Sequence, residues 1–416
     1  MKNVLIVTQH FPPINNVAAR RFGWMSAYFE DFGWRPYVLT TVSEGPLSVP
    51  IPEEHCIRLF RHPHRNKKMN SSKSMSAARN RYSSISSLVP NNIRLRSFDN
   101  TVLNWYLPIL NELDWIIDKF PKPDLVIGSY SPSASLLLAR KISIKTNTPW
   151  IADFRDLGAL RNLSSNTLLK WIDSKVEKCI LSRASGITTV SNNLNKLLSE
   201  KYQISTRTIY NGYNSCYKHN SNETYLKQNY NNYIHYAGTI YSHQLPSIKL
   251  LFEVLSEYPD INLMFRSLGP DSLNEEVIKF ANQFNIANQF TLLPPVEPDL
   301  IEEEQDAAIL NLVFEELDKS STWGAGTLTG KFLKLLPVNK PILSICRPDN
   351  EMADILAYTD KGRVCSTKDE IIDFLTFIRE HPSSFSGIMK NINDYSTRMQ
   401  ALKLCDFMTE LSNHSE

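Results

Sequence analysis

The chain lacks the signatures of several common protein classes. Its cysteines form no CxxC pair and no zinc-type spacing; in a sequence of 416 residues they stand at Cys56, Cys179, Cys216, Cys346, Cys365 and Cys405. Scattered cysteines of this kind indicate reduced thiols rather than disulfides or a metal site. No apolar run approaches the roughly 18 residues of a membrane span, and the amino-terminal run at 4–7 is too short for a signal sequence. We therefore expect a cytoplasmic protein.

Neither sign of charge is in clear excess, since the formal net charge is only +2. This balance gives no support to a nucleic-acid partner. A hydrophobic content of 42% and a charged content of 21% are typical of a globular chain rather than a disordered one. The length predicts two or three domains with ample core.

Acidic residues are absent from one long segment, 58–98. It is rich in serine and asparagine, and it contains these basic residues: Arg58, Arg61, Arg65, Lys67, Lys68, Lys73, Arg79, Arg81, Arg94 and Arg96. A polar segment of this length inside a domain is usually functional. Unopposed positive charge predicts contact with an anionic membrane surface or a phosphate-bearing ligand. The alternative is a solvated insertion without a partner.

The rest of the chain alternates between short apolar runs and amphipathic segments. This pattern predicts parallel strands joined by crossover helices. The expected strands are 4–8, 35–41, 57–60, 124–129, 150–152, 186–190 and 206–210, then 233–237, 261–265, 290–293, 307–313, 342–345 and 363–365. A single helix is expected over 100–119, and mostly helix from 368 onward. The fold class is α/β, with two Rossmann-like doubly wound domains facing across a cleft.

We expect the domains to cover residues 1–215 and 231–390, with a linker at 216–230. The final segment, 391–416, is expected to be a helix that packs back on the amino-terminal domain. Ligands of open α/β sheets bind where the strands end at their carboxyl termini. The loop after the first strand carries His10, Pro13, Asn15, Asn16 and Arg20, but no GxGxxG, which disfavours a dinucleotide site.

The stretch 322–345, TWGAGTLTGKFLKLLPVNKPILSI, predicts a loop, a helix, a turn and a buried strand. The amide groups at the start of that helix suit an anion, and Lys331 adds a positive charge. An ordinary surface unit is the alternative.

Seven segments resemble, in order, those of retaining glycosyltransferases with the GT-B fold, a large family that includes bacterial polysaccharide and lipopolysaccharide enzymes. The segments are VTQHFPP, PDLVIGSYSPSASLLLA, PWIADFRDL, ASGITTVS, YNGYN, YAGTIY and TGKFLKLLPVNKPIL. The resemblance implies transfer of a sugar from a nucleotide donor, of UDP or GDP type, held by the carboxyl-terminal domain. The acceptor would be a glycan or a polyprenyl-diphosphate-linked glycan.

The resemblance also implies roles for individual residues. Asp153, Arg155 and Asp156 would grip the acceptor or the reacting sugar; a salt-bridged cap is the alternative. The loop 10–16 would close over the sugar. The donor would be bound by Gly238, Thr239, Arg266, Thr327, Thr329, Gly330, Lys331 and Lys334. No DxD triplet occurs, which suits stabilisation of the phosphates by cation and dipole, without a metal or another cofactor.

Three features depart from the family pattern. Lys334 stands where a glutamate normally binds the donor ribose, Trp323-Gly324-Ala325-Gly326 lacks the usual upstream acid, and Asn15-Asn16 replaces paired glycines. Two alternatives to the transferase therefore stay open. One is an inactive GT-B scaffold of a polysaccharide assembly, and the other is a nucleotide-sugar 2-epimerase. The transferase is expected in the cytoplasm, peripheral on the inner face of the membrane.

Overall fold

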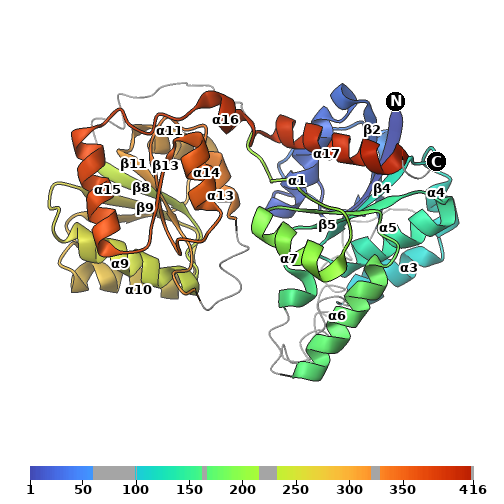
Figure 1. Cartoon of the computed structure of the whole chain (residues 1–416), viewed down its shortest axis with the longest axis horizontal. Helices are drawn as coiled ribbons and strands as arrows, with labels where there is room; N and C mark the ends of the chain where they lie inside the picture. Colours follow the sequence, from blue (N-terminus) through green and yellow to red (C-terminus); the bar gives the residue numbers. More distant parts are fainter. Residues whose placement is uncertain (60–98, 100, 162–165, 215–231, 320–327, 414–416) are drawn as a thin grey trace, which may run out of the picture. The chain divides into compact units, whose positions relative to one another are not determined.

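A computed structural model describes residues 1–59, 99, 101–161, 166–214, 232–319 and 328–413 (Figure 1). Its contacts divide the chain into two units. Unit 1 is Met1–Tyr210 with Gln400–Glu416, and unit 2 is Asn211–Met399. The chain thus leaves unit 1 once and returns to it with its last helix. The predicted linker and nearly all of the basic segment 58–98 lie outside the described residues.

Unit 1 is built on a fully parallel sheet in the order β3-β2-β1-β4-β5-β6-β7. The strands are β1 (Lys2–Val7), β2 (Trp34–Thr41), β3 (Cys56–Leu59), β4 (Leu125–Tyr130), β5 (Trp150–Phe154), β6 (Gly186–Thr189) and β7 (Thr206–Thr208). The order reverses between β1 and β4, which makes this pair the topological switch point. Each predicted strand of this half is present.

The helices of unit 1 connect these strands in sequence order. They are α1 (Val17–Met25), α3 (Leu107–Leu110), α4 (Leu113–Ile117), α5 (Ser133–Thr146), α6 (Thr167–Leu181) and α7 (Asn192–Tyr202), with short 3₁₀ turns at Ser26–Tyr28, Glu30–Phe32, Glu53–His55 and Gly158–Arg161. Several begin at polar caps. The side chain of Asn16 accepts from the amide of Ala19 at 2.8 Å, and Ser191 accepts from that of Leu194 at 3.2 Å. Such caps satisfy amides that have no partner within the helix.

The prediction of one helix over 100–119 is wrong. The structure has a π-helical turn (Val102–Tyr106) followed by the short helices α3 and α4. Pro108 lies at the start of α3 and lacks the N–H that a continuous helix would need. The backbone nevertheless stays helical through Pro108 to Leu110, and the break falls at Asn111 and Glu112, although the apolar spacing continues through it.

Unit 2 repeats the architecture with a six-stranded parallel sheet, β10-β9-β8-β11-β12-β13. Its strands are β8 (Tyr233–Gly238), β9 (Asn262–Ser267), β10 (Phe290–Leu293), β11 (Leu310–Phe314), β12 (Ile342–Ile345) and β13 (Gly362–Cys365). Its helices are α9 (Leu245–Leu255), α10 (Asp271–Gln283), α11 (Pro298–Ala307), α13 (Gly330–Leu335), α14 (Met352–Thr359), α15 (Lys368–Glu380) and α16 (Met389–Asn393), after a 3₁₀ turn at Ser242–Gln244. The switch point lies between β8 and β11. The predicted fold class of two doubly wound Rossmann-like domains is confirmed.

The last helix, α17 (Thr397–Asn413), belongs mostly to unit 1. Its apolar side chains Leu404, Phe407 and Met408 are buried in one cluster with β1, β2 and α1. Trp34 donates to the hydroxyl of Thr409 at 3.1 Å, and the ammonium of Lys2 donates to that of Ser412 at 2.7 Å. The final helix therefore forms part of the unit 1 core.

Candidate functional site

The carboxyl ends of β8 and β11 lie at the switch point of unit 2, and polar side chains gather there. β8 ends at Gly238 and continues into Thr239, while Glu315 directly follows β11. The amino-terminal turn of α13 brings Lys331 to the same place. This edge is where an open parallel sheet binds its ligand.

The ammonium of Lys331 donates to two neutral oxygens, the hydroxyl of Tyr236 at 3.1 Å and the carbonyl of Thr239 at 2.8 Å. It also lies 5.2 Å from the centroid of the Tyr236 ring. Burial lowers the pKa of Lys331 to about 8, against the opposite effect of Glu315. Among the described residues, this cation has no carboxylate within ion-pair distance. It is a cation held in place by neutral groups.

Gly238 lets Lys331 reach this position. A Cβ at residue 238 would lie 2.1 Å from the Lys331 Nζ, and the backbone has a φ of +146°, which L side chains rarely adopt. The predicted donor residues Gly238, Thr239 and Lys331 are thus brought together. Gly330 is different, because a Cβ there would meet open space.

Three further side chains lie at the same edge and were not predicted. Glu315 is only 5% exposed, and its carboxylate lies 3.3 Å from His243 Nε2. The rings of His243 and Tyr241 stack with centroids 5.6 Å apart, and the Lys331 ammonium is 6.0 Å from the Tyr241 ring. An acid placed immediately after a buried strand was a signal for Glu315 that the sequence analysis could have used.

The other predicted donor residues are arranged in three ways. Thr329 caps α13, its hydroxyl accepting from the amide of Lys331 at 3.4 Å. Lys334 is exposed and lies near Glu302 of α11, whose pKa is raised by burial and partly lowered by this lysine. Thr327 lies outside the described residues.

Arg266 does not have the geometry that was predicted for it. Its guanidinium pairs with the Glu304 carboxylate at 2.5 Å and donates to the carbonyl of Pro294 at 2.8 Å. Glu304 is 1% exposed and is also contacted by the buried His235 at 3.3 Å. Burial alone would raise the pKa of Glu304, but the bonds from His235 and Arg266 hold it below its usual value. Arg266 is committed to this internal pair, so a role for it in binding the diphosphate finds no support here.

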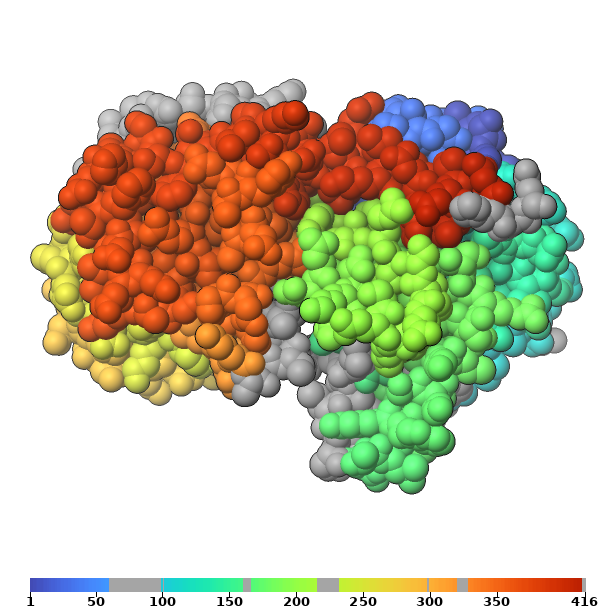
Figure 2. Space-filling view, in the orientation of Figure 1, coloured from blue at the N-terminus to red at the C-terminus, as the bar shows by residue number. Residues whose placement is uncertain are grey.

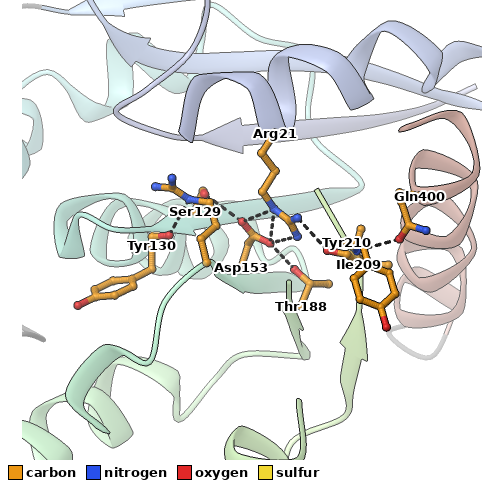
Figure 3. Close-up of polar contacts among 9 residues, drawn as sticks. Arg21, Ser129, Tyr130, Asp153, Thr188, Ile209, Tyr210 and Gln400 are labelled. Carbon is orange, nitrogen blue, oxygen red and sulfur yellow. Dashed lines mark hydrogen bonds and ion pairs between the residues drawn. The ribbon is translucent and has the colours of Figure 1, made fainter. Parts of the chain in front are cut away.

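The same holds for Asp153 in unit 1 (Figure 3). Its side chain is fully buried and forms an ion pair at 2.7 Å with Arg21, which is buried as well. The hydroxyls of Ser129 and Thr188 also donate to the carboxylate, at 3.0 and 2.8 Å. A carboxylate surrounded in this way forms a structural ion pair, and the role of Asp153 in gripping a substrate stays a prediction.

Arg21 was missed, and it completes this pair from α1. Its remaining nitrogen donates to the carbonyl of Ile209 at 2.8 Å, and Tyr210 N in turn donates to Gln400 of α17 at 2.8 Å. Figure 3 shows these contacts running from Asp153 of β5 to Arg21 of α1, and from Arg21 through Ile209 and Tyr210 to Gln400 of the last helix. A signal existed: Arg21 precedes Met25 by four residues, on the apolar side of the helix.

Arg155 and Asp156 follow Asp153 and occupy the loop after β5. Arg155 donates to the carbonyls of Tyr130 and Ser131 at 2.9 and 2.6 Å, which ties this loop to the end of β4. Burial lowers the pKa of Arg155 to about 10, against the opposite effect of Asp153. Asp156 accepts from the amide of Leu157 at 2.8 Å. Both residues stay at the carboxyl edge of the first sheet.

The predicted residues of the first loop lie close to one another. Asn16 caps α1 and has its amide nitrogen 3.4 Å from His10 Nδ1. Arg20 donates twice to the side-chain oxygen of Asn15, at 2.9 and 2.6 Å. The carbonyl of Pro13 accepts from the amide of Leu47 at 3.0 Å. The loop is therefore held by its own polar side chains at the carboxyl end of β1.

Comparison with known proteins places the fold. No protein-family model matches the chain, and no curated protein sequence matches it. Among solved structures, it is similar to the sucrose-phosphate synthase of Thermosynechococcus elongatus (11% identity, TM-score 0.64, all of both chains). It is also similar to HepE of Anabaena in complex with UDP, at 12% identity and a TM-score of 0.64, with 99% of this chain and 100% of HepE covered. A glycosyltransferase of Rickettsia africae is similar at 13% identity and a TM-score of 0.62, with 99% of this chain and 98% of that protein covered. The resemblance to GT-B proteins is confirmed at the level of the fold.

Proposed function

We propose that the protein is a glycosyltransferase that uses a nucleotide-diphosphate sugar as donor. The acceptor is a glycan or a polyprenyl-diphosphate-linked glycan, in the synthesis of a bacterial surface polysaccharide. Transfer proceeds with retention of configuration and without a metal ion. The retention, the metal independence and the acceptor follow from the sequence resemblance. Glycosyl transfer is also supported by similarly folded glycosyltransferases.

The observation that carries the proposal is the environment of Lys331. A desolvated ammonium whose contacts are neutral oxygens gains free energy from an anion placed beside it, because burial has removed most of its hydration. The position at the switch point is the place where α/β sheets bind nucleotides. HepE, which has a similar fold, was solved with UDP, so UDP is the first nucleotide to test.

In this proposal, the residues at this edge stabilise the leaving group. The bond between the sugar and the diphosphate breaks during transfer, and negative charge builds up on the departing phosphate oxygen. Lys331 stabilises that charge in a site of low polarity, where an electrostatic contact is stronger than in water. Gly238 and Thr239 allow the phosphates to approach the backbone. Glu315 offsets part of the positive charge before the donor binds.

A thermal-shift screen of the full chain tests the proposal, with UDP, GDP, CDP, TDP and ADP as ligands. A nucleotide at about 100 times its dissociation constant adds roughly 2.7 kcal/mol to the stability of the folded protein. One nucleotide should raise the melting temperature. Lys331→Ala should weaken its binding by about 10- to 100-fold, the cost of a lost charge-assisted hydrogen bond. Lys279→Ala, on the exposed face of α10, is the matched control and should leave binding unchanged.

The outcomes separate the three functions. No response to any nucleotide would refute the donor site and favour the scaffold. Binding of UDP together with conversion of a free UDP-sugar to its epimer, in the absence of an acceptor, would favour the 2-epimerase. Binding without epimerisation, followed by transfer to a lipid-linked acceptor, supports the transferase.

A further inference from the structure

Helix α6 carries an unusual outer face in unit 1. The exposed positions 168, 171, 175 and 178 recur at helical spacing and form one stripe along it. The first two are Leu168 and Trp171, with 62% and 58% of their surfaces exposed. The last two are Lys175 and Lys178. A soluble helix normally turns leucine and tryptophan inward.

The acidic residues of α6 are on its opposite side. Asp173 and Glu177 are 0% and 1% exposed. Glu177 accepts from the amide of Ala159 at 2.7 Å, from Lys201 at 3.2 Å and from the hydroxyl of Tyr202. Burying both carboxylates leaves the outer face with lysines and no acid. The stripe is therefore both apolar and positively charged.

The amino-terminal end of α6 stands out from the rest of unit 1 (Figures 1 and 2). Its first turn is fixed by Asn166, whose side chain accepts from the amides of Leu168 and Leu169 at 2.9 and 3.3 Å. The Lys175 ammonium lies 5.5 Å from the centroid of the Trp171 ring. The two apolar side chains are thus presented on an ordered helix with the lysines behind them.

We propose that this face of α6, defined by Leu168, Trp171, Lys175 and Lys178, docks on an anionic lipid bilayer. Tryptophan and leucine enter the interfacial layer, where an indole is stable. The lysines extend their charges to the headgroups. Charge complementarity favours this occupant over a protein surface, because both charged residues of the stripe are lysines. No described helix is long and apolar enough to cross a bilayer, so the contact is peripheral.

This inference is independent of the donor site, and it names a different surface from the basic segment 58–98. The full chain is sedimented with vesicles of phosphatidylcholine alone and with vesicles that contain about one third phosphatidylglycerol. We expect binding to the anionic vesicles only, weakened by salt. Lys175→Ala with Lys178→Ala should reduce binding about 25-fold, or about fivefold for each lysine. Trp171→Ser should reduce it about tenfold.

Matched controls lie elsewhere on the chain. Trp115→Ser changes another exposed tryptophan of unit 1, 52% exposed and 5.2 Å from the Lys119 ammonium, and should leave binding unchanged. Lys279→Ala is the control for charge. If Trp171→Ser lowers the melting temperature, Leu168→Ser provides a second test of the apolar contact with the vesicles.

Three results would overturn the docking proposal. The first is wild-type protein that binds neither vesicle. The second is binding that persists unchanged in the Trp171, Leu168 and double lysine variants, which would assign it to another segment. The third is an oligomer that Leu168→Ser dissociates without any vesicle binding, which would make this face a protein interface.

Discussion

Replacing Arg21 by methionine tests whether the buried pair in unit 1 is structural. The substitution keeps the length of the side chain and removes its charge. It leaves Asp153 fully buried, with hydrogen bonds from Ser129 and Thr188 only. Breaking a buried ion pair in this way costs about 3–5 kcal/mol, a large share of the roughly 5–15 kcal/mol that stabilises a domain. We expect a marked fall in the melting temperature of Arg21→Met.

The exposed pair Arg35–Glu30 provides the matched control. Its atoms are 3.2 Å apart, but its side chains are 44% and 51% exposed. Arg35→Met should therefore cost no more than about 1 kcal/mol. Asp153→Asn keeps an oxygen acceptor for the two hydroxyls and removes the negative charge that faces Arg21. Combined with Arg21→Met, it should be less destabilising than the sum of the single changes, by about 2–3 kcal/mol.

Hydrogen exchange measured on the peptides that contain β5 and β6 reports local stability beside the pair, and calorimetry reports the whole chain. Equal effects of Arg21→Met and Arg35→Met would refute a structural role for the pair. So would an Asp153→Asn variant that keeps full stability but loses sugar transfer. That result would support the prediction that Asp153 contacts a substrate.

Three further predictions concern unit 2. Burial lowers the pKa of Lys331 to about 8, so nucleotide binding measured by calorimetry should weaken as the pH rises through about 8. The Lys331→Arg variant should bind the nucleotide independently of pH over this range, because arginine stays charged. If Lys331→Arg shows the same decline in binding, another group is responsible for the titration. Gly238→Ala should abolish nucleotide binding in the thermal-shift screen, because its Cβ would collide with Lys331. Gly330→Ala is the control and should bind normally, since a Cβ there meets open space. Equal binding by both variants would contradict the close approach of Lys331 to residue 238. Burial also lowers the pKa of Lys361 to about 8, so the unfolded chain binds more protons than the folded protein between about pH 8 and 10.4. The stability of the folded protein should therefore rise with pH across that window. In Lys361→Met, the melting temperature should rise less over the same pH range, because the contribution of Lys361 is gone.

The central strands could be predicted from the sequence because they are mostly apolar runs that are buried on both faces. β11 and β12 show this, since all of their residues are buried, whereas the edge strands β3, β7 and β10 contain no buried residue. The predicted helix 100–119 is instead interrupted at Asn111 and Glu112, inside a segment whose apolar spacing continues. Apolar spacing describes which side of a segment packs inward, but it does not show whether the backbone hydrogen bonds continue.

The candidate site was predictable only where position along a strand determined it. Gly238, Thr239 and Lys331 follow or approach strand ends at the switch point, and the structure brings them together. Arg266 and Asp153 also lie at or near strand ends, yet both are paired inside their units. Their partners, Glu304 and Arg21, are 38 and 132 residues distant in the chain. Pairing across such separations depends on tertiary packing, which local patterns do not specify.

This difference explains why Lys331 is the most informative residue of the predicted set. A cation that meets a buried carboxylate, as Arg21 and Arg266 do, has its charge balanced within the protein and gains little from a ligand. Lys331 meets a hydroxyl and a carbonyl, while the nearby Glu315 lies at ion-pair distance from His243 rather than from Lys331. Its charge is only partly compensated, and we therefore propose that a phosphate of the donor binds beside it. The pairing of each cation, more than its place in a motif, therefore separates the ligand-binding candidate from the structural ones.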